Sequence, residues 1–458
     1  MHLALRLLTI CVFAMGCSSA PKTIQVARET SPVESRDEAS FMRGPHVNAF
    51  YGRYRMPWKH QSAIHVAHGA AHDVFELAHL QEHEKTDERF NAEMLEGTLK
   101  HPPKTEAEMQ TYGPYIGQSI WQLYRAIDWT HIHHGATYDV MSSDEIAWDQ
   151  KKEWTDKTVR HYLEKLDVAR SPAPLDVTMR RAGVMMKPYF TYFRNYYPKS
   201  NNYFYAAHWW HPVIYEAMML GGNGKLQDEI VRATDELTPA VFKDPPLRMP
   251  LSREIMPRYA QMSPESANIF DNLHMLHGIA YDIMAYPNWS LDQKKAELNR
   301  VVRAMAYQPG DEKLARKFSI PHPEMDPRRY EAWMKTPEGS MTDIMEEMML
   351  EMMPMMMPNI TASQNSSVMA QLKMKLTPGM QEGEIQGSLH DALMKIMPEI
   401  KMAKGAMEPG ESSPEMMNMM MAGWTKKHGM IPDAPMIAMD KEPGATVRSV
   451  ALTEGGSQ

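Results

Sequence analysis

The sequence is poor in cysteine, and this scarcity excludes several classes of protein. Only two cysteines occur among the 458 residues, Cys11 and Cys17, and both lie in the first 17. Without that leader the chain has no disulfide framework, no zinc finger and no cluster ligated by cysteine. The sequence also contains no CxxCH, so it has no site for the covalent attachment of a c-type haem.

Charge of one sign and long hydrophobic runs are scarce as well. The net charge is −8, with basic and acidic residues interspersed, and this balance gives no reason to expect a nucleic-acid partner. The apolar run 7–15 is too short to span a bilayer, and no later run reaches the length of a transmembrane helix. Strand-like alternation of polar and apolar residues is nearly absent too, which leaves helices as the expected secondary structure.

Residues 1–17 have the pattern of a signal peptide, with a basic residue, a short apolar run and the sequence AMGCSS at positions 14–19. This pattern resembles a bacterial lipoprotein signal, although Ala14 stands where an aliphatic residue such as Leu is usual. The resemblance implies that Cys17 is lipidated after cleavage and that the serine after it directs the protein to the outer membrane. Ordinary secretion is the alternative. We therefore expect a periplasmic protein anchored to the membrane through Cys17, with residues 18–46 as a flexible tether.

Two residue types that bind metals are abundant. The chain has 44 methionines and 20 histidines. Imidazole suits copper, zinc, iron and nickel, whereas the thioether of methionine is a soft ligand that suits Cu(I). The composition thus favours a metal-binding protein without cysteine ligands.

A motif with two histidines recurs four times. The copies are HVAHGAAHDVF (65–75), HIHHGATYDVM (131–141), HWWHPVIYEAM (208–218) and HMLHGIAYDIM (274–284). The third copy begins 143 residues after the first, and the fourth begins 143 residues after the second. Residues 128–152 also match 271–295 without a gap. This single offset predicts an internal duplication, with halves at about 47–185 and 190–328.

Region 47–330 is predicted to be an all-α, internally duplicated helical bundle. Segments 149–166 and 292–306 are amphipathic and open at an Asp that can cap a helix. Each half then has two motif helices and an amphipathic covering helix, and the halves pack about a pseudo-twofold axis. Pro212 follows the second histidine of the third copy, so we expect the helix to kink there or to begin at about His211.

The spacing of the histidines predicts a metal site. Two histidines three residues apart share one face of an α-helix, with Cβ atoms roughly 5–6 Å apart. Eight imidazoles in one bundle are hard to bury as ordinary core residues, because each neutral ring needs partners for two nitrogens. The number of ligands exceeds the need of one tetrahedral ion, so two or three ions are expected. The predicted ligands are His65, His68, His131, His134, His208, His211, His274 and His277.

Each motif copy also carries an acid and an aromatic residue that can support the ligands. The acid lies at about 80° around the helix from the first histidine, where its carboxylate can accept an imidazole N–H from an adjacent helix. The aromatic residue lies on the histidine stripe, where it can donate a hydrogen bond to a metal-bound ligand or pack in the core. The predicted second-shell or bridging residues are Asp73, Asp139, Glu216, Asp282, His72, Tyr138, Tyr215 and Tyr281.

One further histidine serves as an internal control. His133 lies about 200° around the helix from His131. The fourth copy has Leu276 at the corresponding position. We therefore expect His133 to face away from the metal site.

The composition changes in region 331–458, which is rich in methionine. Dense clusters occur in 341–357 and 415–421 and resemble the methionine-rich segments of copper-handling proteins. We expect Cu(I) capture by these clusters, with a flexible surface for a protein partner as the alternative. Residues 403–415 and 440–458 are expected to be disordered. The candidate Cu(I) ligands are Met348, Met349, Met352, Met353, Met355, Met356, Met357, Met416, Met417, Met419, Met420 and Met421.

An envelope signal, a multi-histidine site and a methionine-rich region together predict an extracytoplasmic metal-binding lipoprotein for metal storage or handling. Copper is the expected metal, and iron and zinc stay open because imidazole binds them too. Haem b is a further alternative, although two histidines per helix exceed what axial ligation needs.

Two other functions are compatible with the same residues. A metal-dependent oxidoreductase would use oxygen or a small redox substrate at the His, Tyr and Asp residues, and it would need an open coordination position. A structural envelope lipoprotein would use the motif only to pack helices.

Overall fold

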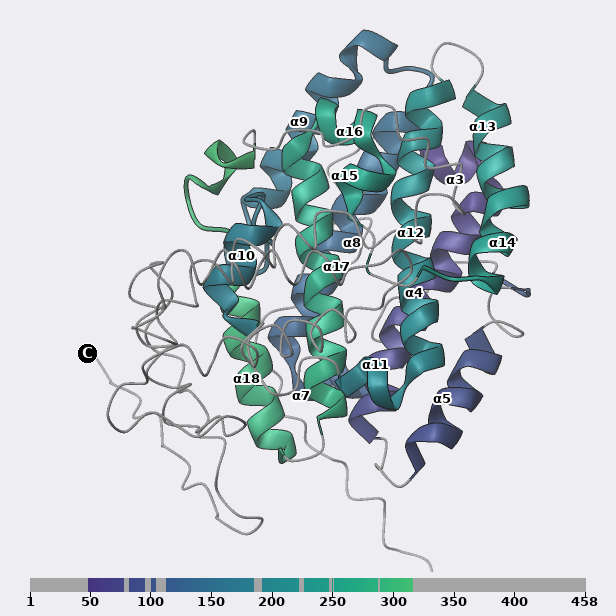
Figure 1. Cartoon of the computed structure of the whole chain (residues 1–458). Coiled ribbons are helices and arrows are strands. Elements are labelled where there is room, and N and C mark those ends of the chain that lie inside the picture. The colour runs from purple at the N-terminus through teal and green to yellow at the C-terminus, as the bar shows by residue number, and fades with distance from the viewer. Residues whose placement is uncertain are drawn as a thin grey trace, which may run out of the picture. The chain divides into compact units, whose positions relative to one another are not determined.

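The computed structural model describes most of the region between residues 48 and 315. The described residues are 48–77, 82–94, 100–103, 113–184, 192–221, 226–246, 249, 251–286 and 289–315. They are helical almost throughout and contain no β-strand, which confirms the all-α prediction for this part of the chain (Figure 1). The predictions for the signal peptide, Cys17, the tether and the methionine clusters lie outside the described residues.

The four motif copies lie on the four longest of the described helices. These helices are α4 (Arg55–Leu77), α8 (Trp121–Ser142), α12 (Pro198–Gly221) and α17 (Pro264–Ala285). Helices α12 and α17 each pack against both α4 and α8, so the four form the centre of a bundle (Figure 1). In the described part of the chain no helix is both long and apolar enough to cross a bilayer.

Shorter helices cover this central bundle. On one side α9 packs against α8, and α18 packs against α8 and α17; on another, α5, α13 and α14 pack against α12. The covering helices are α5 (His83–Ala92), α9 (Lys151–Leu163), α10 (Leu175–Ala182), α13 (Leu226–Arg232), α14 (Thr238–Lys243) and α18 (Leu291–Ala304). Five helices of four to six residues connect the elements: α3 (Ala49–Arg53), α7 (Pro114–Ser119), α11 (Tyr192–Tyr196), α15 (Ser252–Ile255) and α16 (Pro257–Met262).

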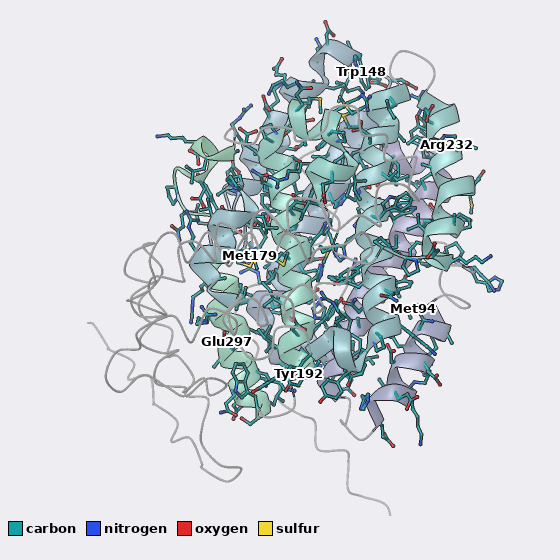
Figure 2. The ribbon with its side chains drawn as sticks, in the orientation of Figure 1. Met94, Trp148, Met179, Tyr192, Arg232 and Glu297 are labelled. Atoms are coloured by element: carbon teal, nitrogen blue, oxygen red, sulfur yellow. The ribbon has the colours of Figure 1, made fainter. Side chains whose placement is uncertain are left out.

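Large apolar side chains fill the spaces between the helices (Figure 2). Trp209 and Trp210 are both fully buried next to the motif histidines of α12, and burying a side chain of this size contributes several kcal/mol. Helix α12 continues through Pro212, so the alternative in which the helix begins at about His211 is not observed. His208 and His211 lie on one continuous helix, although proline cannot donate a backbone hydrogen bond there.

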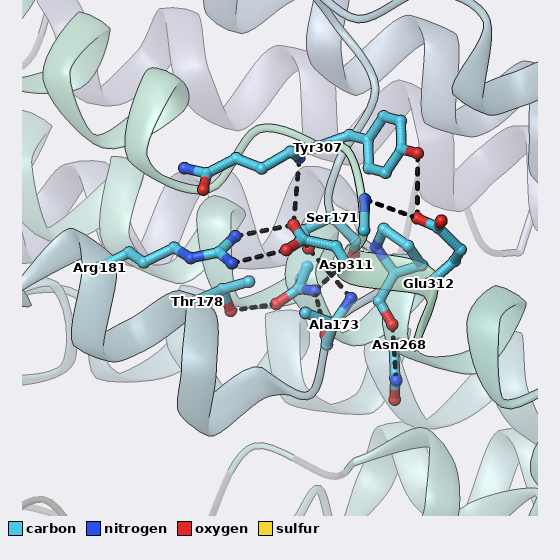
Figure 3. A network of polar contacts seen from close by, with 12 residues as sticks. Ser171, Ala173, Thr178, Arg181, Asn268, Tyr307, Asp311 and Glu312 are labelled. Carbon is cyan, nitrogen blue, oxygen red and sulfur yellow. Dashed lines mark hydrogen bonds and ion pairs between the residues drawn. The ribbon is translucent and has the colours of Figure 1, made fainter. Parts of the chain in front are cut away.

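A buried polar network ties the segment after α9 to the segment after α18 (Figure 3). The Arg181 guanidinium donates to both carboxylate oxygens of Asp311, at 2.7 and 2.5 Å. Ser171 donates to the same carboxylate at 2.6 Å, and Asn272 donates to the carbonyl oxygen of Ser171 at 2.6 Å. Helix α17, which carries Asn272, is thereby connected to both segments.

We expect Asp311→Ala to lower the free energy of unfolding by about 3–5 kcal/mol. The substitution leaves the guanidinium of Arg181, whose side chain is only 11 % exposed, without its partner. Urea denaturation followed by circular dichroism measures the loss. The double variant Arg181→Met/Asp311→Leu should recover much of it, because two apolar side chains leave no unpaired charge. A double variant as unstable as Asp311→Ala would contradict this account.

Candidate metal centre

All eight motif histidines are buried at the centre of the bundle. Each is at most 3 % exposed, and their rings form one continuous group of contacts. The closest pairs join histidines from different helices: His65 and His131 stack with ring centroids 3.9 Å apart, and His208 and His274 meet edge to face at 4.1 Å. The structure therefore brings all eight predicted ligands together in a histidine cluster, by which we mean these eight side chains.

Within the histidine cluster, two groups of three can each hold a metal ion. The first is His68, His208 and His277, and the second is His134, His211 and His274. In each group the candidate ligand atoms lie within 4.8 Å of one another. Each group draws its members from three different long helices, so metal binding would cross-link the bundle.

The two remaining histidines lie beside these groups. The ring of His131 is 6.4 Å from that of His68 and 6.2 Å from that of His277. The ring of His65 is 5.4 Å from that of His211. Each group of three therefore has a fourth imidazole whose ring centroid lies 5.4–6.4 Å from that of at least one member.

Many ring nitrogens in the histidine cluster have no hydrogen-bond partner among the described residues. This holds for both nitrogens of His68, His211, His274 and His277 and for Nε2 of His134 and His208. A buried donor or acceptor without a partner costs about 1–3 kcal/mol. A metal ion would accept the lone pairs of these ring nitrogens. The histidines therefore fit a metal site better than a purely structural core.

One ligand is already fixed by a backbone carbonyl in the tautomer that leaves Nε2 available, and a second has a hydroxyl at its Nδ1. His208 Nδ1 lies 2.6 Å from the carbonyl oxygen of Phe204, and a carbonyl can only accept. His134 Nδ1 lies 3.0 Å from the hydroxyl of Tyr215. Such partners orient the ring and set which nitrogen faces a metal.

Burial keeps the imidazoles in the form that binds metals. Desolvation lowers the pKa of His68, His134, His208, His211 and His277 well below the usual value, and nearby histidines lower it further. Burial alone lowers the pKa of His274 to about 3. Neutral imidazole has the free lone pair that a metal requires, so the cluster is in its ligand form at neutral pH.

The four motif acids accept hydrogen bonds from backbone N–H groups of other segments. Asp139 accepts the backbone N–H groups of Asn48 and Phe50 at the start of α3, both at 2.9 Å. The other three acids accept from the starts of further short helices: Asp73 from Tyr115 and Ile116 of α7, Asp282 from Phe193 of α11, and Glu216 from Arg258 of α16. The acids thus cap helix N-termini, where amides lack intrahelical partners and negative charge is stabilised.

We expect Asp139→Ala to lower the free energy of unfolding by about 1–2 kcal/mol without changing the metal content. The substitution removes the acceptor of two backbone amides at a helix start. Chemical denaturation and elemental analysis of the same sample measure the two effects. Asp149→Ala, at an exposed position in the following turn, should change stability by less than about 0.5 kcal/mol. Loss of metal from Asp139→Ala would instead support the sequence prediction that this carboxylate accepts an imidazole N–H of a ligand.

The predicted aromatic residues divide into two kinds. The hydroxyls of Tyr138 and Tyr281 donate to the backbone carbonyls of His211 and His68, at 2.8 and 3.2 Å, and so hold the ligand helices together. Tyr215 instead lies against the imidazole of His134 and the hydroxyl of Thr137. Sequence reasoning missed Thr137, because one hydroxyl within a helix gives no signal until its neighbours are known.

His133 faces away from the histidine cluster, as its helical position predicts. Its ring packs against Tyr162 and Phe270, at centroid distances of 4.8 and 5.4 Å. Its Nε2 lies 3.1 Å from the hydroxyl of Ser266. His133 is therefore a buried histidine with a polar partner outside the candidate ligand set.

The sequence DQKK occurs at 149–152 and again at 292–295, and the sequence analysis left its lysines without a role. The ammonium of Lys151 donates to the carbonyls of Val140 and Ser143 at the end of α8, at 2.7 and 2.6 Å. Lys294 donates in the same way to Met284 at the end of α17. The repetition of DQKK beyond the histidines was the available signal for these helix C-terminal contacts.

No known protein family, curated protein or solved structure matches this chain.

Proposed function

We propose that the protein is a metal-binding protein that holds two ions in its histidine cluster, for metal storage or handling. The observation that carries the proposal is the set of buried ring nitrogens without hydrogen-bond partners, contributed by all four long helices. A fold that places so many neutral imidazoles together loses stability unless a ligand occupies them.

The contacts support two layers along the bundle, each with one histidine from every long helix. His131 completes the group of His68, and His65 completes the group of His211. The first layer is His68, His131, His208 and His277, and the second is His65, His134, His211 and His274. Four imidazoles around one ion match the coordination number of zinc and of many copper sites.

The layers also support the internal duplication proposed from the sequence. Adding 143 to any residue of the first half gives a residue of the second, and this offset exchanges the two layers. The short distances repeat accordingly, at 4.7 Å for His68 with His277 and 4.6 Å for His134 with His211. Helix starts repeat at the same offset: Ala49 and Tyr192, Arg55 and Pro198, Pro114 and Pro257, Trp121 and Pro264.

Copper is the metal that we propose, with iron or zinc as alternatives. All-imidazole donors accept each of the three ions, and the choice of copper rests on the methionine-rich region outside the described residues. Haem b fits less well, because stacked rings 3.9 Å apart leave no room for a macrocycle between them. The location that we propose is the periplasm, with a lipid anchor at Cys17, on the basis of the leader alone.

An oxidoreductase is the second candidate, and Tyr215 is the observation in its favour. Its hydroxyl contacts the imidazole of His134 and the hydroxyl of Thr137. This arrangement gives a ligand ring a buried phenol through which a proton could move. When bound, a redox-active metal would supply the electron transfer, while His134 would be held in position by Tyr215.

Elemental analysis of the full-length protein, purified from the envelope of its native host, tests the proposal. We expect close to two metal ions per chain. An electron paramagnetic resonance spectrum of the same sample identifies Cu(II) ligated by imidazole nitrogens. A protein that carries no metal, and that takes up neither copper nor zinc nor iron when each is supplied, would leave the cluster as a structural core.

A further inference from the structure

The proposed duplication is broken at one place beside the histidine cluster. Tyr215 and His72 are 143 residues apart and lie in corresponding positions. The ring of Tyr215 is 5.4 Å from that of His134, and the ring of His72 is 5.5 Å from that of His277. One layer therefore has a phenol where the other has an additional imidazole.

The phenol belongs to a closed set of hydrogen bonds. With Nε2 of His134 facing a metal, Nδ1 carries the hydrogen and donates to the Tyr215 oxygen. The Tyr215 hydroxyl can then donate to Thr137, whose own hydroxyl donates to the carbonyl of His133 at 3.0 Å. Every group in this set has a partner, so His134 has one preferred orientation.

His72 has no such partners. It is fully buried, and both of its ring nitrogens lack a hydrogen-bond partner among the described residues. Ala280 stands at the position that corresponds to Thr137, so no hydroxyl is available from that side. The Tyr281 ring lies 4.7 Å from His72, but its hydroxyl donates to the carbonyl of His68.

The neighbours of His72 are themselves candidate ligands. His68 and His72 are four residues apart on α4, the spacing at which two histidines on one helix face bind a single metal ion. His277 approaches both, with ring centroids 4.7 Å from His68 and 5.5 Å from His72. All six ring nitrogens of these three residues are without hydrogen-bond partners in the described part of the chain.

We propose that His68, His72 and His277 form a third metal position, to which an ion passes from the layer of His68 when it leaves or enters the histidine cluster. This inference rests on the proposed function. The ion in the layer of His68 is then the exchangeable one, and the ion in the layer of His134 is retained. His72 lies one turn nearer than His68 to the end of α4 at Leu77, about 6 Å farther along the helix axis.

The transfer is an exchange of neutral ligands. The bonds from the ion to His131 and His208 break, the bonds to His68 and His277 persist, and a bond to His72 forms. Neutral imidazole binds through a lone pair, so no proton or electron has to move. The two positions share two ligands and are occupied in turn, which gives the ion a path on which it is never released from the protein.

Release kinetics of bound copper test the third position. The full-length protein is loaded with Cu²⁺ alone and mixed with excess EDTA, and the loss of the protein-bound copper absorbance is followed in time. We expect two phases in the unaltered chain. In His72→Leu the ion loses the ligand that receives it, so the rate constant of the faster phase should fall at least about tenfold, an increase of about 1.4 kcal/mol in the activation free energy.

The converse variant is Tyr215→His, which places an imidazole four residues after His211 and so builds the missing position on the other layer. We expect the slower phase to accelerate in this variant. His133→Leu, whose side chain faces Ser266, should leave both phases unchanged. Far-UV circular dichroism of each variant checks that the helices are intact.

The outcomes separate this inference from the proposed function. An unaltered chain that binds no copper, iron or zinc would contradict the proposed function. Two bound ions with the same release rates in His72→Leu and in the unaltered chain would contradict only the third position, and His72 would then be a packing residue. Unchanged slow release in a folded Tyr215→His variant would contradict it as well.

Discussion

We expect His134→Leu and His277→Leu each to remove at least one metal ion per chain, whereas His133→Leu retains the full content. His134 and His277 belong to the two different groups of three histidines that can hold an ion. His133 lies next to His134 in the sequence, yet its ring contacts Tyr162 and the hydroxyl of Ser266 instead. His133 and His134 are neighbours in the sequence, so comparing their variants tests whether the direction of the side chain decides metal binding.

Metal content of the three variants is measured by elemental analysis after identical loading. Leucine fits an apolar core, so each variant should keep its helices and lose metal affinity more than stability. Thermal denaturation of the metal-free forms provides that control. Equal metal loss in His133→Leu and His134→Leu would contradict the assignment of faces, and retention of metal in all three would contradict the metal centre itself.

The helical period was sufficient to predict much of the centre of the molecule. Residues at positions i and i+3 must share a face of any regular helix, so the sequence alone could place the two histidines of each motif side by side. The same reasoning directed His133 to the opposite side. These predictions depend only on local geometry, which is why they did not require knowledge of the rest of the chain.

The partners of the motif acids could not be predicted in this way. Asp139 bonds to Asn48 and Phe50, about 90 residues away, and the short helix α3 that contains Phe50 has no strong sequence signal. A carboxylate beside a histidine stripe is compatible with an imidazole partner or an amide partner. The choice between them depends on tertiary structure, so the sequence could not show the backbone amides that these carboxylates accept from.

Pro212 and His72 show two further limits of sequence reasoning. A proline within a helix predicts a kink or a helix boundary, yet α12 runs through Pro212 from Pro198 to Gly221, with Trp209 and Trp210 fully buried beside it. His72 was grouped with the tyrosines because it occupies the aromatic position of the motif. Its distinct surroundings became evident only when the ring of His277 and the side chain of Ala280 could be placed beside it.

We expect the metal-free protein to unfold steeply as the pH falls from about 6.5 to 5. Burial lowers the pKa of His72, His133 and His274 in the folded state to about 3, while the unfolded chain titrates near 6.5. Below pH 6.5 the unfolded chain therefore takes up protons that the folded chain does not. Stability is fully present above pH 6.5, falls with decreasing pH and continues to fall until the folded pKa values are reached.

The size of this effect follows from the number of imidazoles. In this window each neutral imidazole lowers the free energy of unfolding by about 1.4 kcal/mol per pH unit, so three lower it by about 4 kcal/mol per unit. A typical domain has about 5–15 kcal/mol in total, and the other buried histidines add to the loss. Urea denaturation at a series of pH values between 7 and 5 measures the slope, and His133→Leu should make it shallower by about 1.4 kcal/mol per unit.

Saturation with metal should move the acid transition to lower pH. An ion that binds only the folded chain, at a free concentration about 1,000 times its dissociation constant, adds about 4 kcal/mol. This amount offsets roughly one pH unit of the loss expected for three imidazoles. A metal-free protein with the same stability at pH 7 and pH 5 would show that the cluster histidines take up protons in the folded state and are not held neutral by burial.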